Sequence, residues 1–153
     1  MSETNEKRNF SNTVTFTVRD KNGDIKRQET TTNVITNSGL ELSSRLLGEG
    51  LGGNRLSHIA VGSDGTPKTA SDTSLGNEVS RDNASVSVET DTVTNDTAQF
   101  STTFSFGSQT TIEETGLYDS ATGGTLFAVT TKGPFNLDAQ DSLQIVWQVR
   151  STQ

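Results

Sequence analysis

The sequence predicts a mainly β protein: a single, jelly-roll-like β-sandwich of about eight or nine strands with one short helix. Short segments alternate apolar and polar residues with a period of two, which is the period of a half-buried strand. Turn residues separate these segments at regular intervals, and the chain has only two prolines but many threonines. A length of 153 residues is enough for one ordinary domain and too short for two comfortable ones.

A clear strand signal follows the polar start of the chain, where apolar side chains alternate with threonines over residues 13–18. Asn22-Gly23 follows, and we expect this pair to supply the positive φ angles of a tight hairpin turn. The returning strand, residues 25–32, is strongly polar. We therefore expect that strand at a sheet edge or in a contact between subunits.

One helix is predicted after Asn37-Ser38-Gly39, which offers a capping start to a run of leucines at approximately helical spacing. Gly48 is expected to end the helix, and a glycine-rich loop follows. Residues 48–53 match the letters of the dinucleotide-binding fingerprint, but that motif needs a strand before it and a helix after it. The order here is reversed, so we interpret the glycines as a helix stop and a loop.

The remaining segments are predicted strands and turns. A buried strand is expected at residues 57–62, followed by a loop of about sixteen residues, a length typical of functional or intersubunit elements. We expect one strand to be interrupted near Thr115 and another to be broken by Gly133-Pro134. The other predicted strands alternate apolar and polar residues: 84–88, 98–106, 112–118, 126–129 and 143–149. Trp147 alternates with aliphatic residues in the last strand and is interpreted as a core residue.

Composition indicates a thin core. Hydrophobic residues make up 29% of the chain, and even with the 14 glycines the fraction stays below the ~45–50% of ordinary globular domains. Buried surface between subunits can supply what such a core lacks, so we expect a homo-oligomer. Residues 1–9 are polar and lack periodicity, and we expect a neighbouring subunit to order them.

Charge and cysteine content exclude several functions. A net charge of −7 and a pI near 4.6 disfavour nucleic acid and anionic membranes as partners. The absence of cysteine excludes disulfides, thiolate zinc sites and cysteine nucleophiles. No apolar run approaches the ~18 residues of a membrane-spanning helix, and the polar start does not resemble a signal peptide.

No residue is predicted to be catalytic or to bind a cofactor. His58 is the only histidine and stands among apolar residues at a strand start, so we interpret it as structural. Glu113 and Glu114 are adjacent, and on a strand their side chains point to opposite faces. They therefore do not form a catalytic pair by themselves.

No metal site is predicted either. Asp20, Asn22 and Asp24 could offer oxygens to calcium, but the rest of a calcium loop and its distal glutamate are missing. A hairpin turn accounts for all three. Three further acidic residues share no metal-binding spacing: Asp64, Asp72 and Asp82.

The order of several short motifs carries a resemblance. These motifs are Val34-Ile35-Thr36-Asn37-Ser38-Gly39-Leu40, residues 59–67, 72–75, 78–81, 112–118 and 123–128, and the last strand. Over residues 34–150 the chain resembles small structural proteins of tailed phages and archaeal tailed viruses, found as tail, baseplate, fibre or head-surface components. The resemblance implies a small β-sandwich that serves as an assembly module without catalytic residues. Arg81 and Glu114 occupy charged positions that recur in this pattern. A buried or intersubunit ion pair would explain them, surface exposure being the alternative.

We therefore expect a non-enzymatic virion component, assembled in the host cytoplasm. It would be a homo-oligomeric ring or spike on the head (turret or decoration) or the tail (baseplate or fibre), in contact with other virion proteins. Residues 1–33 are predicted to be an arm and hairpin for docking, and residues 34–153 the β-sandwich body. The alternative function is a glycan- or receptor-binding module, with a secreted hydrolase as a remote third.

Overall fold

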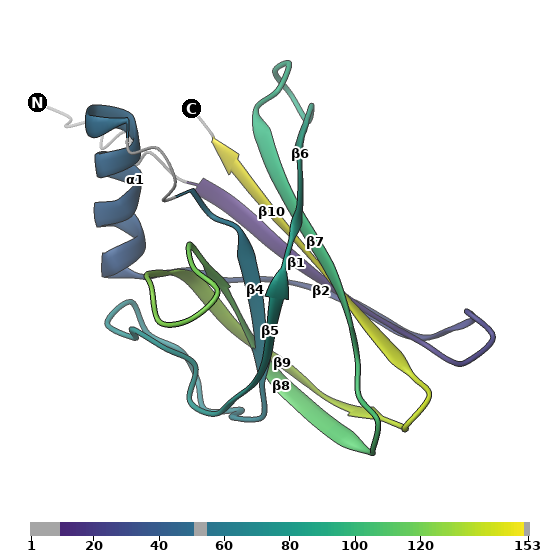
Figure 1. The fold of residues 1–153 in the computed structure, drawn as a ribbon. Coiled ribbons are helices and arrows are strands. Elements are labelled where there is room, and N and C mark those ends of the chain that lie inside the picture. Colours follow the sequence, from purple (N-terminus) through teal and green to yellow (C-terminus); the bar gives the residue numbers. More distant parts are fainter. Residues whose placement is uncertain (1–9, 51–54, 152–153) are drawn as a thin grey trace, which may run out of the picture.

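The computed structural model describes residues 10–50 and 55–151, which form two five-stranded antiparallel sheets and one helix (Figure 1). The first sheet contains, in spatial order, β2 (Ile25–Thr32), β1 (Phe10–Arg19), β10 (Ser142–Ser151), β7 (Thr97–Ser105) and β6 (Ser85–Glu89). The second sheet contains β3 (Val34–Ile35), β9 (Leu126–Leu137), β8 (Thr110–Tyr118), β4 (His58–Gly62) and β5 (Glu78–Asn83). The helix is α1 (Asn37–Glu49). The predicted mainly β sandwich with one short helix is confirmed, with ten strands where eight or nine were predicted.

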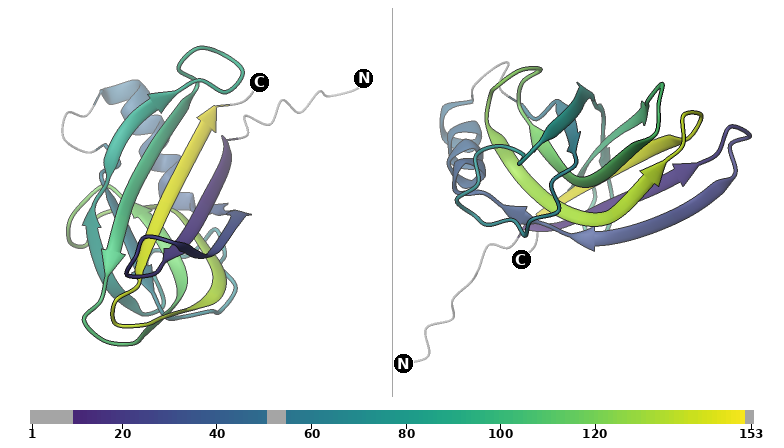
Figure 2. Two further views of the ribbon diagram at one scale, coloured as in Figure 1. Left: turned by 90° about the vertical axis from the view of Figure 1, so that its right-hand side faces the viewer. Right: turned by 90° about the horizontal axis from the view of Figure 1, so that it is seen from below.

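At both pairs of edges, the chain passes directly from an edge strand of one sheet to an edge strand of the other. Only Asn33 separates β2 from β3, and only Ala84 separates β5 from β6. The Ala84 N–H donates to the Ser57 carbonyl at 2.8 Å, which fixes the second corner. Strands that switch sheets in this way make the corners of a sandwich. Figure 2 shows the result as two curved layers, with α1 at one side.

The core lies between the two sheets and is built from alternate residues of their strands. Val14, Trp147 and Phe100 stand side by side on β1, β10 and β7, and each is at most 5% exposed. Phe16 of the first sheet stacks on Phe135 of the second, with ring centroids 4.8 Å apart. The interpretation of Trp147 as a core residue is confirmed.

A second, smaller core covers the outer face of the second sheet. Leu75, from the segment of residues 63–77, packs there against strand residues that include Tyr118 and Leu126. Helix α1 lies against β9 at Gly39, where a Cβ atom would stand 2.1 Å from the Phe127 carbonyl oxygen. The long segment and the helix together therefore form a partial third layer.

The helix boundaries differ from the prediction. Thr36 is the N-cap, and its hydroxyl accepts from the Gly39 N–H at 2.9 Å. The helix continues past Gly48 to Glu49 and ends at Gly50, whose φ of 58° is the left-handed conformation that glycine adopts easily. The glycine-rich loop falls largely outside the described residues.

Two strand predictions and one turn prediction are also corrected. β8 runs unbroken through Thr115, because it pairs with β9 on one side and β4 on the other. β9 continues through Gly133-Pro134, since a register shift opposite Glu113 forms a bulge that tolerates proline. In the first hairpin turn only Gly23 has a positive φ, and Asn22 does not. The Gly23 N–H donates to the Asp20 carbonyl at 3.0 Å, as in a type I turn followed by a left-handed glycine.

The predicted division between residues 33 and 34 is wrong, because the first hairpin is part of the sandwich. β1 lies between β2 and β10 and pairs with β10 along its whole length. Its apolar residues Val14, Phe16 and Val18 are at most 3% exposed in the shared core. β2 is an edge strand, as predicted. The arm, residues 1–9, lies outside the described residues.

Candidate functional site

The most elaborate polar cluster surrounds Glu114 on β8. Its side chain is fully buried and forms an ion pair of 2.6 Å with Lys68, whose side chain is only 6% exposed. The carboxylate also accepts backbone N–H groups of Gly76 and Asn77 at 2.9 and 2.8 Å, and that of Asp64 at 3.3 Å. Every donor comes from the segment of residues 63–77, so this carboxylate fixes the segment to the sheet.

Other contacts hold the same segment. The Tyr118 hydroxyl accepts from the Leu75 N–H at 3.2 Å, and burial raises the pKa of this hydroxyl. The Thr66 hydroxyl and N–H hydrogen-bond the Asp64 carboxylate and lower its pKa. The predicted long loop is therefore a tightly bonded cover on the outer face of the second sheet.

Arg81 on β5 forms a second cluster. Its guanidinium lies over the Tyr118 ring, 3.6 Å from the centroid, and pairs with Glu78 at 2.6 Å. It also donates to the carbonyls of Ser120 and Gly123, at 3.0 and 2.8 Å, in the turn between β8 and β9. The charges predicted at Arg81 and Glu114 are thus both largely buried, and each has its own partner within the chain.

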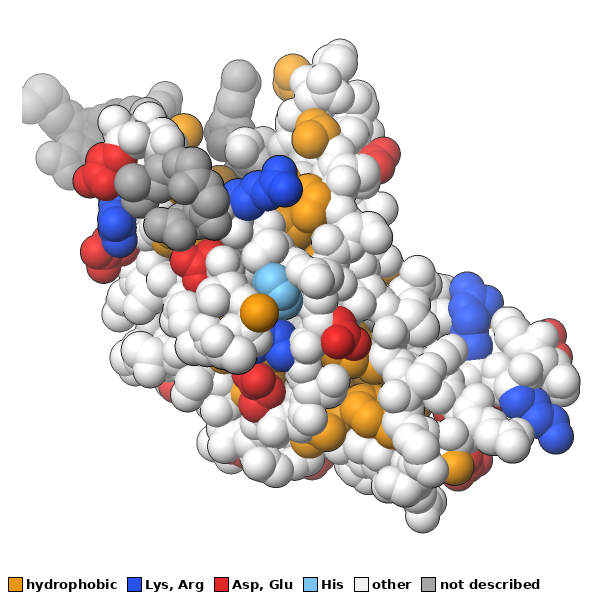
Figure 3. All heavy atoms as spheres, viewed as in Figure 1, with side chains coloured by type: hydrophobic (Ala, Val, Ile, Leu, Met, Phe, Trp, Pro, Cys, Tyr) orange, Lys and Arg blue, Asp and Glu red, His pale blue; other side chains and the backbone are white. Residues whose placement is uncertain are grey.

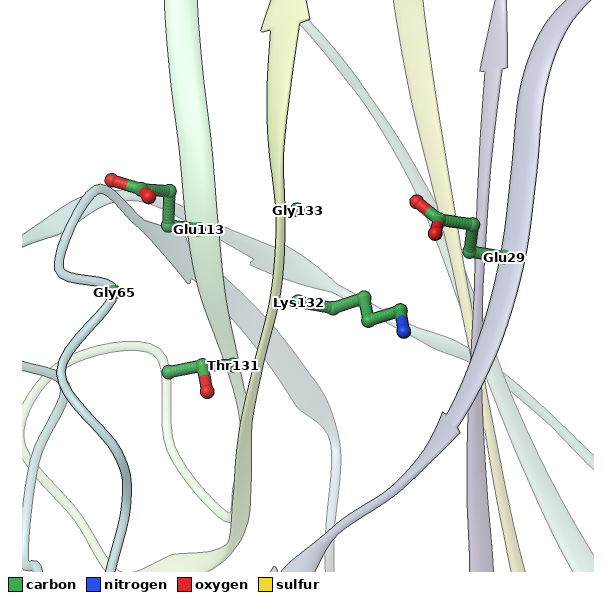
Figure 4. A pocket seen from close by; sticks show the side chains of 6 residues that line it. All are labelled: Glu29, Gly65, Glu113, Thr131, Lys132 and Gly133. Atoms are coloured by element: carbon green, nitrogen blue, oxygen red, sulfur yellow. The ribbon is translucent and has the colours of Figure 1, made fainter.

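A shallow pocket of about 270 Å³ lies where β2 and the bulge of β9 approach residue 65. Its lining includes Glu29, Glu113 and Lys132. Figure 4 shows Lys132 reaching toward the β2 side and Glu113 pointing to the opposite side of β9, toward Gly65. Paired acid–base catalysis requires two carboxylates directed at one reacting bond. The carboxylates of Glu29 and Glu113 do not converge on one point in this way.

The other residues considered from the sequence are dispersed. His58 is half-buried at the start of β4, and its Nδ1 lies 2.8 Å from the Ser57 hydroxyl. Asp20 accepts the N–H groups of Asn22 and Asp24 at 2.8 and 3.0 Å, so the hairpin interpretation of these residues is confirmed. Asp72 accepts from the Thr69 N–H at 2.9 Å, and Asp82 is exposed on β5. Residues 10–50 and 55–151 contain no group of three or more metal-ligating side chains, and no helix long and apolar enough to cross a membrane.

An ion-pair cluster joins β2 to the turn between β9 and β10. Lys26 lies 2.7 Å from Asp141 and 3.3 Å from Asp138. The hydrogen bond to Asp141 is the main cause that raises the Lys26 pKa, and the same bond lowers the pKa of Asp141. This cluster anchors the outer strand of the first sheet.

Three of the seven large apolar side chains exposed in the described residues lie on the hairpin of β6 and β7; the others are Ile25, Leu40, Leu47 and Val79. Val86, Val88 and Val93 are 48%, 59% and 60% exposed, and Figure 3 shows hydrophobic side chains along this upper hairpin. In contrast, all nine aromatic residues lie within the described chain and none is exposed. The apolar surface offered to a partner is therefore aliphatic.

Sequence reasoning singled out Glu114 but missed both Lys68 and the apolar hairpin. A regular valine–serine alternation marked β6 as a half-buried strand, whereas all five of its residues are exposed. Comparison of the chain with protein-family models, with curated proteins and with solved structures gives no match.

Proposed function

We propose that this chain is a non-enzymatic structural component of a tailed-virus virion, a homo-oligomeric appendage on the surface of the head or the tail. The order of motifs described above supports the viral assignment. The observation that carries the structural role is the aliphatic hairpin of β6 and β7, where Val86 and Val88 are exposed on one face of β6. Exposed contiguous apolar surface on a soluble domain is typical of interaction sites.

The polar clusters support a structural role as well. The hydrogen bonds and ion pairs of three side chains hold segments of the same chain together: Glu114, Lys68 and Arg81. A reacting group needs a free lone pair or proton directed at a substrate. These side chains instead make contacts that stabilise the fold, as expected in a rigid structural protein.

A mass-spectrometric count of copies in purified particles tests the proposal. We expect the chain in fixed stoichiometry to the major capsid or tail protein, in multiples of five, six or three according to the socket it occupies. Absence from purified particles would contradict a structural role. Binding to a glycan array at useful affinity would instead favour the receptor-binding alternative, although no exposed aromatic ring is present in the described residues to stack on a sugar.

A further inference from the structure

The inner face of the first sheet continues past the end of the second sheet. Val86 and Val88 pair across the sheet with Phe100 and Ala98, which pack on or against the core. Residues directly opposite each other share a face, so the two valines belong to the core-facing side. They are nevertheless about half exposed, because no strand of the second sheet covers them.

The free edge of β6 is also unprotected. Natural edge strands are usually blunted by charged residues, prolines or bulges. β2, the opposite edge of the same sheet, carries Lys26, Arg27 and Glu29. β6 carries no charge from Ser85 to Val88, and in the described chain only β7 pairs with it.

The hairpin that presents this edge is braced. The Asp96 carboxylate accepts the N–H groups of Asp91, Thr92 and Val93 at 2.9, 3.0 and 3.0 Å, which lowers the pKa of Asp96 and closes the loop. Arg150 of β10 pairs with Asp91 and ties the loop to the sheet. A surface held in place before binding loses little conformational entropy on association.

We propose that β6 is the contact through which two copies of this chain associate, each β6 pairing with the other antiparallel across a two-fold axis. This rests on the homo-oligomer of the proposed function and identifies its surface. Pairing would continue the first sheet from one copy into the next and cover Val86 and Val88 in both. The uncharged stretch of residues 85–88 brings no like charges together.

The charges at the two ends of β6 select a second copy as the occupant. Antiparallel pairing places Glu89 of one copy beside the Ser85 end of the other. At that end the Ser57 carbonyl accepts a hydrogen bond from the Ala84 N–H. Arg55 is two residues before Ser57 in the sequence, so it lies near the Ser85 end of β6. Arg55 is exposed, and none of the ion pairs within the described residues involves it. With this register we expect two Arg55–Glu89 ion pairs across the two-fold axis.

The oligomeric state of the full chain, measured by light scattering and sedimentation over micromolar concentrations, tests this contact. Val88→Lys places two like charges across the axis, and we expect it to raise the dissociation constant by roughly a factor of ten or more. The matched control is Ile25→Lys, because Ile25 is 52% exposed at the start of β2. It should leave the assembly unchanged. Circular dichroism checks that both variants are folded.

The outcomes separate this contact from the proposed function. A wild-type oligomer that survives Val88→Lys unchanged would overturn the assignment to β6 and leave the homo-oligomer standing. A wild-type monomer throughout would overturn both.

A charge exchange tests the antiparallel register. Arg55→Glu and Glu89→Arg should each weaken association, and the double variant should restore most of it, because the swapped pair is again complementary. Failure of the double variant to restore association would overturn the two-fold pairing.

Discussion

The carboxylate of Glu114 shows how one residue organises a segment of fifteen. Its two oxygens receive one ammonium and three backbone N–H groups, all from residues 63–77. Taking two charges out of water is expensive, and only mutual pairing and full hydrogen bonding repay that cost. The intact ion pair of Glu114 and Lys68 is therefore tolerated in the interior, whereas removal of one partner destabilises the folded protein.

Glu114→Gln is expected to destabilise the protein strongly. The substitution keeps the shape of the side chain but leaves Lys68, only 6% exposed, without a counter-charge. Breaking a buried pair in this way costs about 3–5 kcal/mol in free energy of unfolding. Urea denaturation followed by tryptophan fluorescence measures the change, since Trp147 is in the core.

The control for that experiment is the adjacent residue. Glu113→Gln makes the same chemical change at a half-buried position of β8, opposite the bulge, with no ion pair within the described residues. It should change the free energy of unfolding by less than about 0.5 kcal/mol. Equal effects of the two substitutions would mean that the pair with Lys68 contributes nothing.

At the scale of elements, the contact between α1 and β9 depends on a glycine. Gly39 lies in the first turn of the helix, next to the N-cap Thr36, whose hydroxyl also donates to the Leu126 carbonyl. Any side chain at position 39 would meet the backbone of β9. The helix can approach the sheet this closely only because that position has no Cβ.

Two glycine substitutions in this helix should act in opposite directions. Gly39→Ala improves helix propensity but places a Cβ 2.1 Å from the Phe127 carbonyl oxygen, so it should destabilise the protein by about 1–3 kcal/mol. Gly48→Ala has nothing within 4 Å of the new Cβ and should stabilise it by up to about 1 kcal/mol. Thermal denaturation of the two variants compares them directly, and a destabilising Gly48→Ala would contradict this account.

The ion pair between Lys26 and Asp141 attaches β2, the outer strand of the first sheet, to the turn before β10. Because Asp141 can be protonated, this attachment depends on pH. The pKa of Asp141 is lowered below its ordinary 3.8, first by the hydrogen bond from Lys26. A carboxylate with a lowered folded-state pKa stabilises the fold above its unfolded pKa, and this contribution is lost as the pH falls through the folded value. The loss belongs to the acid range below about pH 4.

Asp141→Asn should reduce the dependence of the free energy of unfolding on pH in the acid range. The variant is expected to be less stable than wild type at neutral pH and to converge toward it as the pH is lowered, because protonation already removes the ion pair in the wild type. Urea midpoints measured from neutral pH down to about pH 2 show the convergence. Asp82→Asn, exposed on β5, is the control and should run parallel to wild type.

At the scale of the whole molecule, local patterns predicted most strands, and long-range contacts decided the rest. The alternation in residues 13–18 and 143–149 located β1 and β10, but nothing local states that these strands are neighbours. Lys68 and Glu114 meet across 46 positions of sequence, so no spacing indicated that pair. The exposure of β6 was missed because alternation marks two different faces without saying whether a second sheet covers one of them.

The same limit explains the misplaced boundary after residue 33. A hairpin with one apolar face must pack on something, and sequence alone does not distinguish its own sandwich from a neighbouring subunit. The structure places β1 second in a five-stranded sheet, with ten residues in register with β10. The hairpin is thus a central component of the fold.

Deletion of residues 1–32 should therefore prevent folding and not merely docking. It removes two of the five strands of the first sheet together with Val14, Phe16 and Val18 from the core. Burying each such side chain contributes about 1.5–3 kcal/mol, and a domain has only about 5–15 kcal/mol of net stability. The truncated chain should show no cooperative unfolding transition by circular dichroism, and its β10 would be left with an open edge that favours aggregation.

Adding the missing strands back distinguishes loss of the core from a simple defect of the truncated chain. A synthetic peptide of residues 10–32 contains both β1 and β2, so it should restore a cooperative transition to the truncated chain by completing the sheet beside β10. The same peptide with Phe16→Asp should not, because Phe16 is fully buried against Phe135. A truncated chain that folds alone would show instead that the hairpin is a separable attachment, and that β10 can form the edge of the first sheet without it.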